Sequence, residues 1–221
     1  MAWDTILFDL DGTLTDSGPG IINGVEYTVE QMGLPRHERS FYRRFIGPPL
    51  QWSFQEFFGL EEDRAKEAVR TYRAYYTETG IWENAPYPGI EALLAELAAA
   101  GKVLMVASAK PEVMAVRVLE HFGLMEHLRY VAGASLNEAR DQKSEAIRRC
   151  LERSAGRAVM VGDRLYDVRG AHENGIGAIG VLYGYGGRQE LEEAGADALA
   201  EDVPALRQLL LTGTEINTKT C

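Results

Sequence analysis

The segment Ile6-Leu7-Phe8-Asp9-Leu10-Asp11-Gly12-Thr13 decides the fold that this sequence predicts. Its three apolar residues are typical of a short buried strand, and the short polar residues and glycine after them favour a turn. Two carboxylates, those of Asp9 and Asp11, therefore lie where a strand ends. The segment thus predicts both the first strand of a sheet and an acidic site at its end.

Four further short apolar runs occur much later in the chain, at residues 103–107, 130–132, 158–161 and 178–182. Helical patterns alternate with these runs, at residues 90–100, 112–122, 144–153 and 167–174. Continuous apolar strands that alternate with helices are typical of a parallel sheet covered on both faces. The sequence therefore predicts an α/β fold with a doubly wound parallel sheet.

Residues 16–85 break this alternation, because they contain amphipathic helical runs and no strand candidate. Their longest predicted helix covers residues 61–79. We therefore expect an α/β core formed by residues 1–15 and 86–211, with a helical cap inserted over residues 16–85. The last ten residues, 212–221, lack apolar periodicity and are expected to form a flexible tail.

The composition narrows the classes of function. The 221 residues are 46% hydrophobic and 25% charged, an ordinary globular profile, with a formal net charge of −10. This charge disfavours binding to nucleic acid or to an anionic membrane. Two cysteines cannot form a disulfide framework, and no basic leader or apolar run of about 20 residues is present. We therefore expect a cytoplasmic protein that acts on a small molecule.

Polar side chains follow three of the predicted strands. They are Asp9 and Asp11, Ser108, and Asp163, with Asp167 one helical turn further. In open α/β sheets, ligands bind at the carboxyl ends of the strands near the point where strand order reverses. Clustered carboxylates repel one another unless a cation is bound, and oxygen ligands suit Mg²⁺. We infer a Mg²⁺ site that shares its coordination shell with a substrate phosphate.

The chemistry-bearing segments also resemble a known family. Phe8-Asp9-Leu10-Asp11-Gly12-Thr13-Leu14, Ser108, Lys143 and Gly162-Asp163-Arg164-Leu165-Tyr166-Asp167 look like the four motifs of the haloacid dehalogenase superfamily, in the family's order. The resemblance covers about residues 5–211. The helical insertion and its segment Phe45-Ile46-Gly47-Pro48-Pro49-Leu50 resemble the phosphoglycolate phosphatase-like branch. This resemblance implies a Mg²⁺-dependent phosphatase that works through an aspartyl-phosphate intermediate.

The acidic residues then take distinct roles. Asp9 is the expected nucleophile, and Asp11 the expected proton donor and acceptor. Asp9, the backbone carbonyl of Asp11 and Asp163 would hold Mg²⁺. Asp167 is either a further ligand or a brace behind the first ligands.

Three residues are expected to bind the substrate phosphate. Ser108 precedes a helix whose first turn suits Pro111, so its hydroxyl and the nearby Ala109 amide would receive phosphate oxygens. Lys143 would supply a positive charge, with Lys110 as a nearby competitor for that role.

The cap contains weaker candidates. Arg43 and Arg44, beside the Gly47 turn, could meet an anionic substrate tail, although a solvated pair is the favoured interpretation. The nearby aromatic residues are better explained as cap core than as a base-stacking surface. The glycine-rich segment 183–187 has no Lys-Ser/Thr ending and predicts a mobile turn that lines the site.

Several functions remain open at this point. The candidate substrates are phosphoglycolate and a nucleoside 5′-monophosphate, because a cap of this size closes over small molecules. A sugar-phosphate mutase shares the same core motifs. A dehalogenase is disfavoured because similar dehalogenases lack the second aspartate, here Asp11. A non-catalytic, receiver-like phosphate switch is disfavoured because such domains are shorter and carry no large cap.

Overall fold

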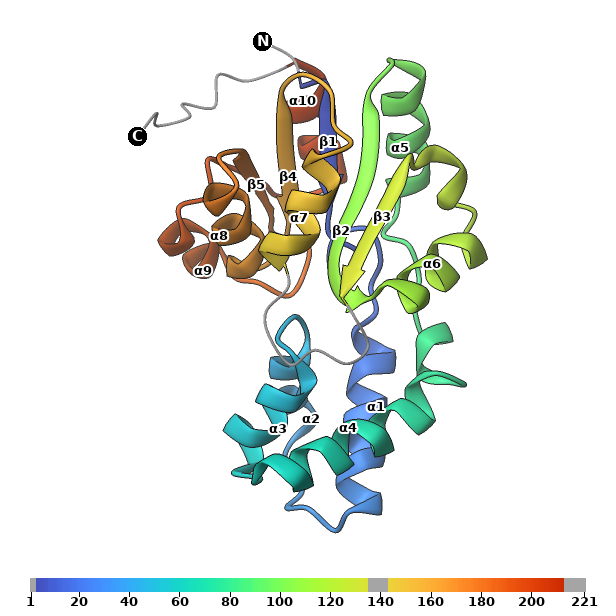
Figure 1. Ribbon diagram of the computed structural model, residues 1–221, viewed down its shortest axis with the longest axis vertical. Helices are drawn as coiled ribbons and strands as arrows, with labels where there is room; N and C mark the ends of the chain where they lie inside the picture. The colour runs from blue at the N-terminus through green and yellow to red at the C-terminus, as the bar shows by residue number, and fades with distance from the viewer. Residues whose placement is uncertain (1–2, 135–142, 213–221) are drawn as a thin grey trace.

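One parallel sheet organises the protein. The computed structural model describes residues 3–134 and 143–212 (Figure 1). Its strands are β1 (Thr5–Phe8), β2 (Val103–Pro111), β3 (Tyr130–Ala134), β4 (Ala158–Gly162), β5 (Gly177–Val181) and β6 (Ala198–Ala200). They form a single sheet in the order β3-β2-β1-β4-β5-β6, and each neighbouring pair is parallel. This arrangement confirms the predicted doubly wound α/β fold.

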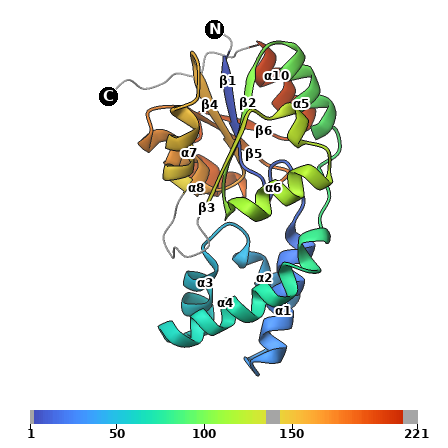
Figure 2. The ribbon, with the colours of Figure 1, turned by 45° about the vertical axis from the view of Figure 1, so that its right-hand side comes forward.

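Helices cover both faces of the sheet (Figure 2). They are α5 (Ile90–Ala99), α6 (Glu112–His121), α7 (Lys143–Leu151), α8 (Leu165–Glu173), α9 (Arg188–Ala194) and α10 (Val203–Thr212), with a 3₁₀ turn η3 (Met125–His127). Side chains alternate along a strand, so Ile6 and Phe8 pack with α5, α6 and α10, whereas Leu7 packs with α7, α8 and α9. Because both faces of β1 are covered, all of its side chains are buried.

Part of this sheet domain was missing from the sequence-based prediction. β6, α9 and α10 had no counterpart there. β6 is only three residues long, too short for a strand periodicity to emerge. Thr212 is the last residue of α10, and the remainder of the predicted tail lies outside the described residues.

The inserted segment is helical, as its pattern predicts. Its elements are α1 (Gly18–Gln31), α2 (Arg39–Tyr42), η1 (Arg43–Phe45), α3 (Leu50–Phe58), α4 (Glu62–Tyr76) and η2 (Gly80–Trp82). Helices α1 to α4 form a group beyond the arrowheads of β2 and β3 (Figure 1). We call residues 16–85 the cap and propose these boundaries for it.

The cap has apolar packing of its own. The ring of buried Phe45 lies 5.0 Å from that of Phe54 and 5.2 Å from that of Phe57. Phe45, Phe54 and Phe57 thus pack the inside of the cap, as expected from the sequence, whereas the nearby Trp52 is exposed.

The cap and the sheet are joined by two chain crossings that lie side by side. The backbone amide of Asp16 donates to the carbonyl of Ala85 at 2.8 Å, and the amide of Tyr87 donates to the carbonyl of Leu14 at 3.1 Å. The cap therefore leaves and rejoins the core at one place, next to the end of β1. Among the described residues, no helix combines the length and the apolar character needed to cross a membrane.

Candidate active site

The position of β1 between β2 and β4 creates the site. Phe8, the last residue of β1, is paired with Val106 on one side and Val161 on the other. The amide of Asp9 continues this pairing and donates to the carbonyl of Val161 at 2.8 Å. The segments after these three strands therefore meet at one edge, which is where strand order reverses.

Three carboxylates meet at this edge. Asp9, Asp163 and Asp167 each offer an oxygen, and these oxygens lie within 4.8 Å of one another. All three side chains are buried. Burial raises the pKa of the Asp9 carboxyl to about 6, while the charge of Lys143 opposes this shift. Burial, and then the charges of Asp167 and Asp9, raises the pKa of Asp163 well above its ordinary value.

The donor set of this cluster suits a hard divalent cation. Buried carboxylates this close together repel one another, and an ion of charge +2 removes the repulsion. Oxygen-only donors favour Mg²⁺ or a similar ion over zinc or copper. The residues present therefore fit a divalent metal.

Asp163 is held by the turn after β1 and by the segment after β5. Its Oδ2 accepts from the backbone amide of Tyr185 at 2.8 Å, and its Oδ1 accepts from the Thr13 hydroxyl at 3.4 Å. Gly12 has φ +86°, and a Cβ there would lie 2.3 Å from Asp163 Oδ2. A Cβ at Gly184 would lie 2.4 Å from the Cβ of Asp163. Within the segment 183–187, predicted as a mobile turn that lines the site, Gly184 and the Tyr185 amide thus lie against Asp163. This segment is not among the described residues that line the cavity of the site.

Asp167 lies in the first turn of α8. Its Oδ2 accepts from the backbone amide of Arg164 at 2.9 Å, as part of a capping box at the start of this helix. A Cβ at Gly162 would lie 2.1 Å from the Asp167 Cγ, so only glycine allows this close approach. The Gly-Asp-x-x-x-Asp spacing thus brings the carboxylates of Asp163 and Asp167 close together after the end of β4.

Lys143, the first residue of α7, reaches two of these carboxylates. Its Nζ lies 2.8 Å from Asp9 Oδ1 and 2.7 Å from Asp167 Oδ1, and it donates to the carbonyl of Ala107 at 3.0 Å. Burial disfavours the charged ammonium, but the charges of Asp167 and Asp9 outweigh it and raise the pKa of Lys143. The lysine therefore stays protonated beside the candidate nucleophile.

Ser108 and Ala109 lie in the last part of β2. The Ser108 side chain is buried, and its Oγ accepts from the backbone amide of Lys110 at 3.2 Å. The expectation that Pro111 belongs to the first turn of the next helix is wrong: β2 continues through Pro111, and α6 begins at Glu112. Ser108 thus reaches the site from a strand rather than from a helix terminus.

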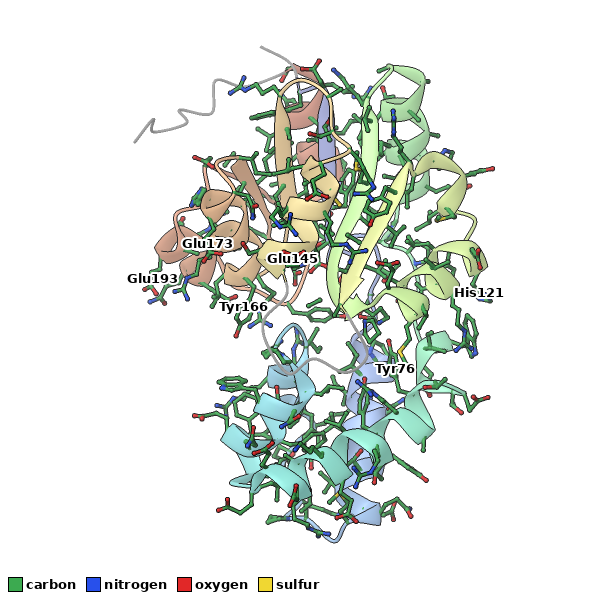
Figure 3. The ribbon with its side chains drawn as sticks, viewed as in Figure 1. Tyr76, His121, Glu145, Tyr166, Glu173 and Glu193 are labelled. Carbon is green, nitrogen blue, oxygen red and sulfur yellow. The ribbon has the colours of Figure 1, made fainter. Side chains whose placement is uncertain are left out.

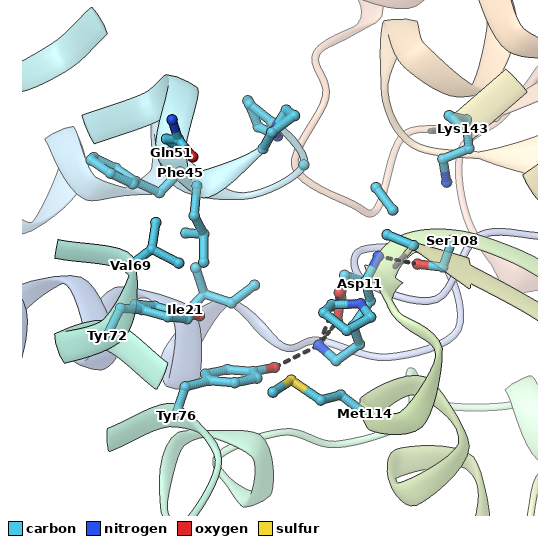
Figure 4. A pocket seen from close by; sticks show the side chains of 18 of the residues that line it. Asp11, Ile21, Phe45, Gln51, Val69, Tyr72, Tyr76, Ser108, Met114 and Lys143 are labelled. Carbon is cyan, nitrogen blue, oxygen red and sulfur yellow. Dashed lines mark hydrogen bonds and ion pairs between the residues drawn. The ribbon is translucent and has the colours of Figure 1, made fainter. Parts of the chain in front are cut away.

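Asp11 has a different partner from the other carboxylates. Its two oxygens lie 2.9 and 3.0 Å from the Nζ of Lys110. The same Nζ donates to the hydroxyl of Tyr76, a cap residue, at 2.6 Å (Figure 4). The sequence offered Lys110 only as a competitor of Lys143, and no local pattern indicated its contact with Asp11.

A cavity of about 380 Å³ lies between the cap and the strand ends. Its core side includes Asp9, Asp11, Ser108, Ala109, Lys110, Lys143 and Asp167. Its cap side includes the apolar and aromatic side chains of Ile21, Phe45, Leu50, Val69, Tyr72 and Tyr76 (Figure 4). Lys66, Arg70 and Arg73 of the cap also line the cavity. Its cap wall therefore combines an apolar and aromatic surface with three basic side chains.

Gly47 is the candidate cap residue that lines this cavity. Arg43 and Arg44 are not among the described residues that line it. Both arginines are exposed. The Arg44 guanidinium lies 4.0 Å from the centre of the Phe57 ring, and that of Arg43 lies 5.8 Å from the centre of the Tyr185 ring.

Fold and site together define a class: an α/β protein with an aspartate after the first strand and a buried cluster of three carboxylates at the carboxyl edge of its sheet. The haloacid dehalogenase-like hydrolase family matches residues 6–181. The chain therefore belongs to this family, and within it is a phosphoric monoester hydrolase.

Curated relatives cover nearly the whole chain. A 5′-nucleotidase of Pseudomonas aeruginosa is 39% identical over 95% of this chain and 96% of its own length. A tyrosine-protein kinase, PtkA of Mycobacterium tuberculosis, is 37% identical over 93% of this chain and 72% of its own. A phosphoglycolate phosphatase of Cupriavidus necator is 34% identical over 93% of this chain and 92% of its own.

The fold has a close match among solved structures. The crystal structure of a predicted phosphatase from Clostridium acetobutylicum has a TM-score of 0.90 and 39% identity, covering 96% of this chain and all of that one.

Proposed function

We propose that this protein is a Mg²⁺-dependent phosphatase that hydrolyses nucleoside 5′-monophosphates through an aspartyl-phosphate intermediate. The observation that carries the choice of substrate is the cavity, whose cap wall offers apolar and aromatic side chains beside the basic residues Lys66, Arg70 and Arg73. The name of the Pseudomonas aeruginosa relative supports the same choice.

The size and lining of the cavity favour a nucleoside over a two-carbon acid. A volume of about 380 Å³ lies in the range of pockets that enclose a small organic ligand. Phosphoglycolate has only a single methylene group to place against Ile21, Val69 and Tyr72. A nucleoside base offers a flat face that packs against apolar and aromatic side chains.

The first chemical step uses Asp9 and Asp11. A carboxylate oxygen of Asp9 attacks phosphorus, and the bond from phosphorus to the ester oxygen breaks. Asp11, as the carboxylic acid, donates its proton to the departing oxygen, so the nucleoside leaves as a neutral alcohol. The product on the enzyme is the aspartyl phosphate of Asp9.

The second step regenerates the enzyme. Asp11, now a carboxylate, takes a proton from a water molecule whose oxygen attacks phosphorus. The bond between phosphorus and Asp9 breaks, and inorganic phosphate is released. Lys143 lies 2.8 Å from Asp9 and is close enough to hold that carboxylate in position through both steps.

Asp9, Asp163 and Asp167 would hold the metal ion, together with the backbone carbonyl of Asp11. When bound, Mg²⁺ offsets the repulsion between the anionic nucleophile and the anionic phosphate. Ser108 and the Ala109 amide are proposed to hold the remaining phosphate oxygens.

The test is phosphate release from a panel of substrates with Mg²⁺, and with EDTA in its place. The panel contains a nucleoside 5′-monophosphate, phosphoglycolate and a hexose phosphate. We expect the highest kcat/KM for the nucleotide, no release with EDTA, and no release by Asp9→Asn. A higher kcat/KM for phosphoglycolate would overturn the substrate assignment. Isomerised sugar phosphate would indicate a mutase, and transfer of phosphate from ATP to protein tyrosine would indicate a kinase.

A further inference from the structure

The cap reaches the candidate acid/base of the core through one lysine. Lys110, near the end of β2, contacts Asp11 of the core and Tyr76 of the cap helix α4. Figure 3 shows Tyr76 at the boundary between the cap and the sheet. We propose that Lys110 positions Asp11 for proton transfer and that Tyr76 completes this arrangement only when the cap is closed. This inference rests on the proposed function, in which Asp11 is the acid/base.

The geometry assigns Lys110 to Asp11 rather than to the substrate phosphate. A lysine ammonium has three N–H donors and no acceptor. Its three acceptors here are Asp11 Oδ1 at 2.9 Å, Asp11 Oδ2 at 3.0 Å and the Tyr76 hydroxyl at 2.6 Å. All three donors are therefore matched by protein oxygens, whereas Lys143 contacts the nucleophile Asp9.

Burial makes these contacts strong and directional. The side chain of Lys110 is 4% exposed and that of Asp11 is 14% exposed. Charges shielded from water interact more strongly than exposed ones, so a displaced ammonium would leave Asp11 without its buried partner. Held by both oxygens, the Asp11 carboxyl group has little freedom to rotate away from the leaving oxygen.

Tyr76 is held as firmly on the cap side. Its ring stacks on Tyr72 with centroids 5.2 Å apart and an interplanar angle of 16°, and the Lys110 Nζ lies 4.9 Å from its centroid. Burial, and then the charge of Asp11, raises the pKa of Tyr76 well above its ordinary value. The hydroxyl therefore stays neutral and accepts from the ammonium.

The arrangement couples enclosure of the substrate to proton transfer. Tyr76 belongs to the cap, so it can meet Lys110 only when α4 lies against the strand ends. A second contact of the closed state joins the Arg164 guanidinium of the core to the backbone carbonyl of Ile46 in the cap. With the cap open, Lys110 loses one of its three acceptors, and Asp11 is held less firmly.

The test separates proton transfer from binding by comparing two leaving groups. A ribose 5′-oxygen needs a proton as it departs, whereas the nitrophenolate of p-nitrophenyl phosphate departs without one. The quantity compared is kcat/KM, which covers the steps up to departure of the leaving group and not the later attack of water that both substrates share. We expect Lys110→Met to lower kcat/KM about 100-fold on a nucleoside 5′-monophosphate and less than about tenfold on p-nitrophenyl phosphate. Tyr76→Phe removes only the hydroxyl and should show the same selectivity with a smaller loss, about fivefold.

Tyr75→Phe is the matched control, because Tyr75 neighbours Tyr76 on α4 but its hydroxyl contacts Glu83 at 3.0 Å. It should leave both rates unchanged. Equal losses of kcat/KM on both substrates would overturn the proposal in favour of phosphate binding or a purely structural role. If Lys110→Met does not fold, Tyr76→Phe decides. Its kcat/KM should fall more for the nucleotide than for p-nitrophenyl phosphate, and an equal fall for both, or no fall, overturns the proposal. If the wild-type protein hydrolyses neither substrate, the proposed function itself has failed.

Discussion

The Nζ of Lys143 lies 2.8 Å from Oδ1 of Asp9, and both side chains are buried. The ammonium therefore offsets the negative charge of the candidate nucleophile Asp9. It also lies 2.7 Å from Asp167, so a single lysine stabilises two of the three clustered carboxylates.

Replacing this lysine should harm both stability and turnover. Lys143→Met leaves Asp9 and Asp167 buried without their cation, which should lower the free energy of unfolding by about 3 kcal/mol in metal-free buffer. It should lower kcat about 100-fold, because a preorganised charge at the reacting group is lost. Urea unfolding and steady-state kinetics measure the two effects.

Lys102→Met is the matched control for this change. The Lys102 Nζ donates to the carbonyl of Trp3 at 2.6 Å, away from the cavity. The Lys102→Met protein should keep the wild-type kcat. A Lys143→Met protein with wild-type kcat would contradict the assigned role of Lys143.

A second prediction concerns Gly12, whose φ of +86° and contact with Asp163 both require glycine. Gly12→Ala places a Cβ 2.3 Å from Asp163 Oδ2, so Asp163 must move. We expect weaker Mg²⁺ activation and a loss of activity of at least about tenfold. A Mg²⁺ titration of activity measures both.

Gly101→Ala is the control that separates the effect of backbone strain from the effect of a Cβ in contact with Asp163. Gly101 has φ +75° with nothing within 4 Å of a Cβ. Its substitution should lower the free energy of unfolding by about 1 kcal/mol but leave the Mg²⁺ titration unchanged. Similar Mg²⁺ titrations for the two variants would argue against the role of Gly12 in placing Asp163.

A third prediction links pH, metal and stability. The pKa of Asp9 is about 6 in the folded protein against an ordinary value of 3.8. Between these values the folded, metal-free protein binds more protons than the unfolded chain, so its stability falls as pH rises through this window. Mg²⁺ competes with those protons for the carboxylates, so the gain in Tm from millimolar Mg²⁺ should be larger at about pH 7.5 than at about pH 5. Thermal melts with Mg²⁺ or EDTA test this, and an equal gain at both pH values would contradict it.

A fourth prediction concerns the size of the cavity. Val69 lies on its cap wall, so Val69→Trp should fill part of the space for a nucleoside. The KM for a nucleoside 5′-monophosphate should rise about tenfold, whereas that for a small phosphate ester such as phosphoglycolate should change little. Ala74→Trp, at an exposed position of the same helix, should change neither. A proportional rise for both substrates would show that the cavity does not enclose the nucleoside.

Much of the acidic site could be predicted because it follows from local patterns. Asp9 and Asp163 each come directly after an apolar strand, and parallel strands place their carboxyl ends at one edge. Asp167 is one helical turn beyond Asp163, so their proximity also follows from sequence spacing. The strand β6 could not be predicted, because three residues at the edge of a sheet leave no periodic signal.

The sequence by itself determined the parallel α/β core, the helical cap and the identity of the clustered carboxylates. These depend on hydrophobic periodicity and on short spacings along the chain. Only the tertiary structure decided which lysine serves which aspartate. Lys110 contacts Asp11 across 99 positions and Tyr76 across 34, and both contacts depend on strand order and on where the cap rests. No local pattern encodes such pairings, because they form only after distant segments have packed against one another.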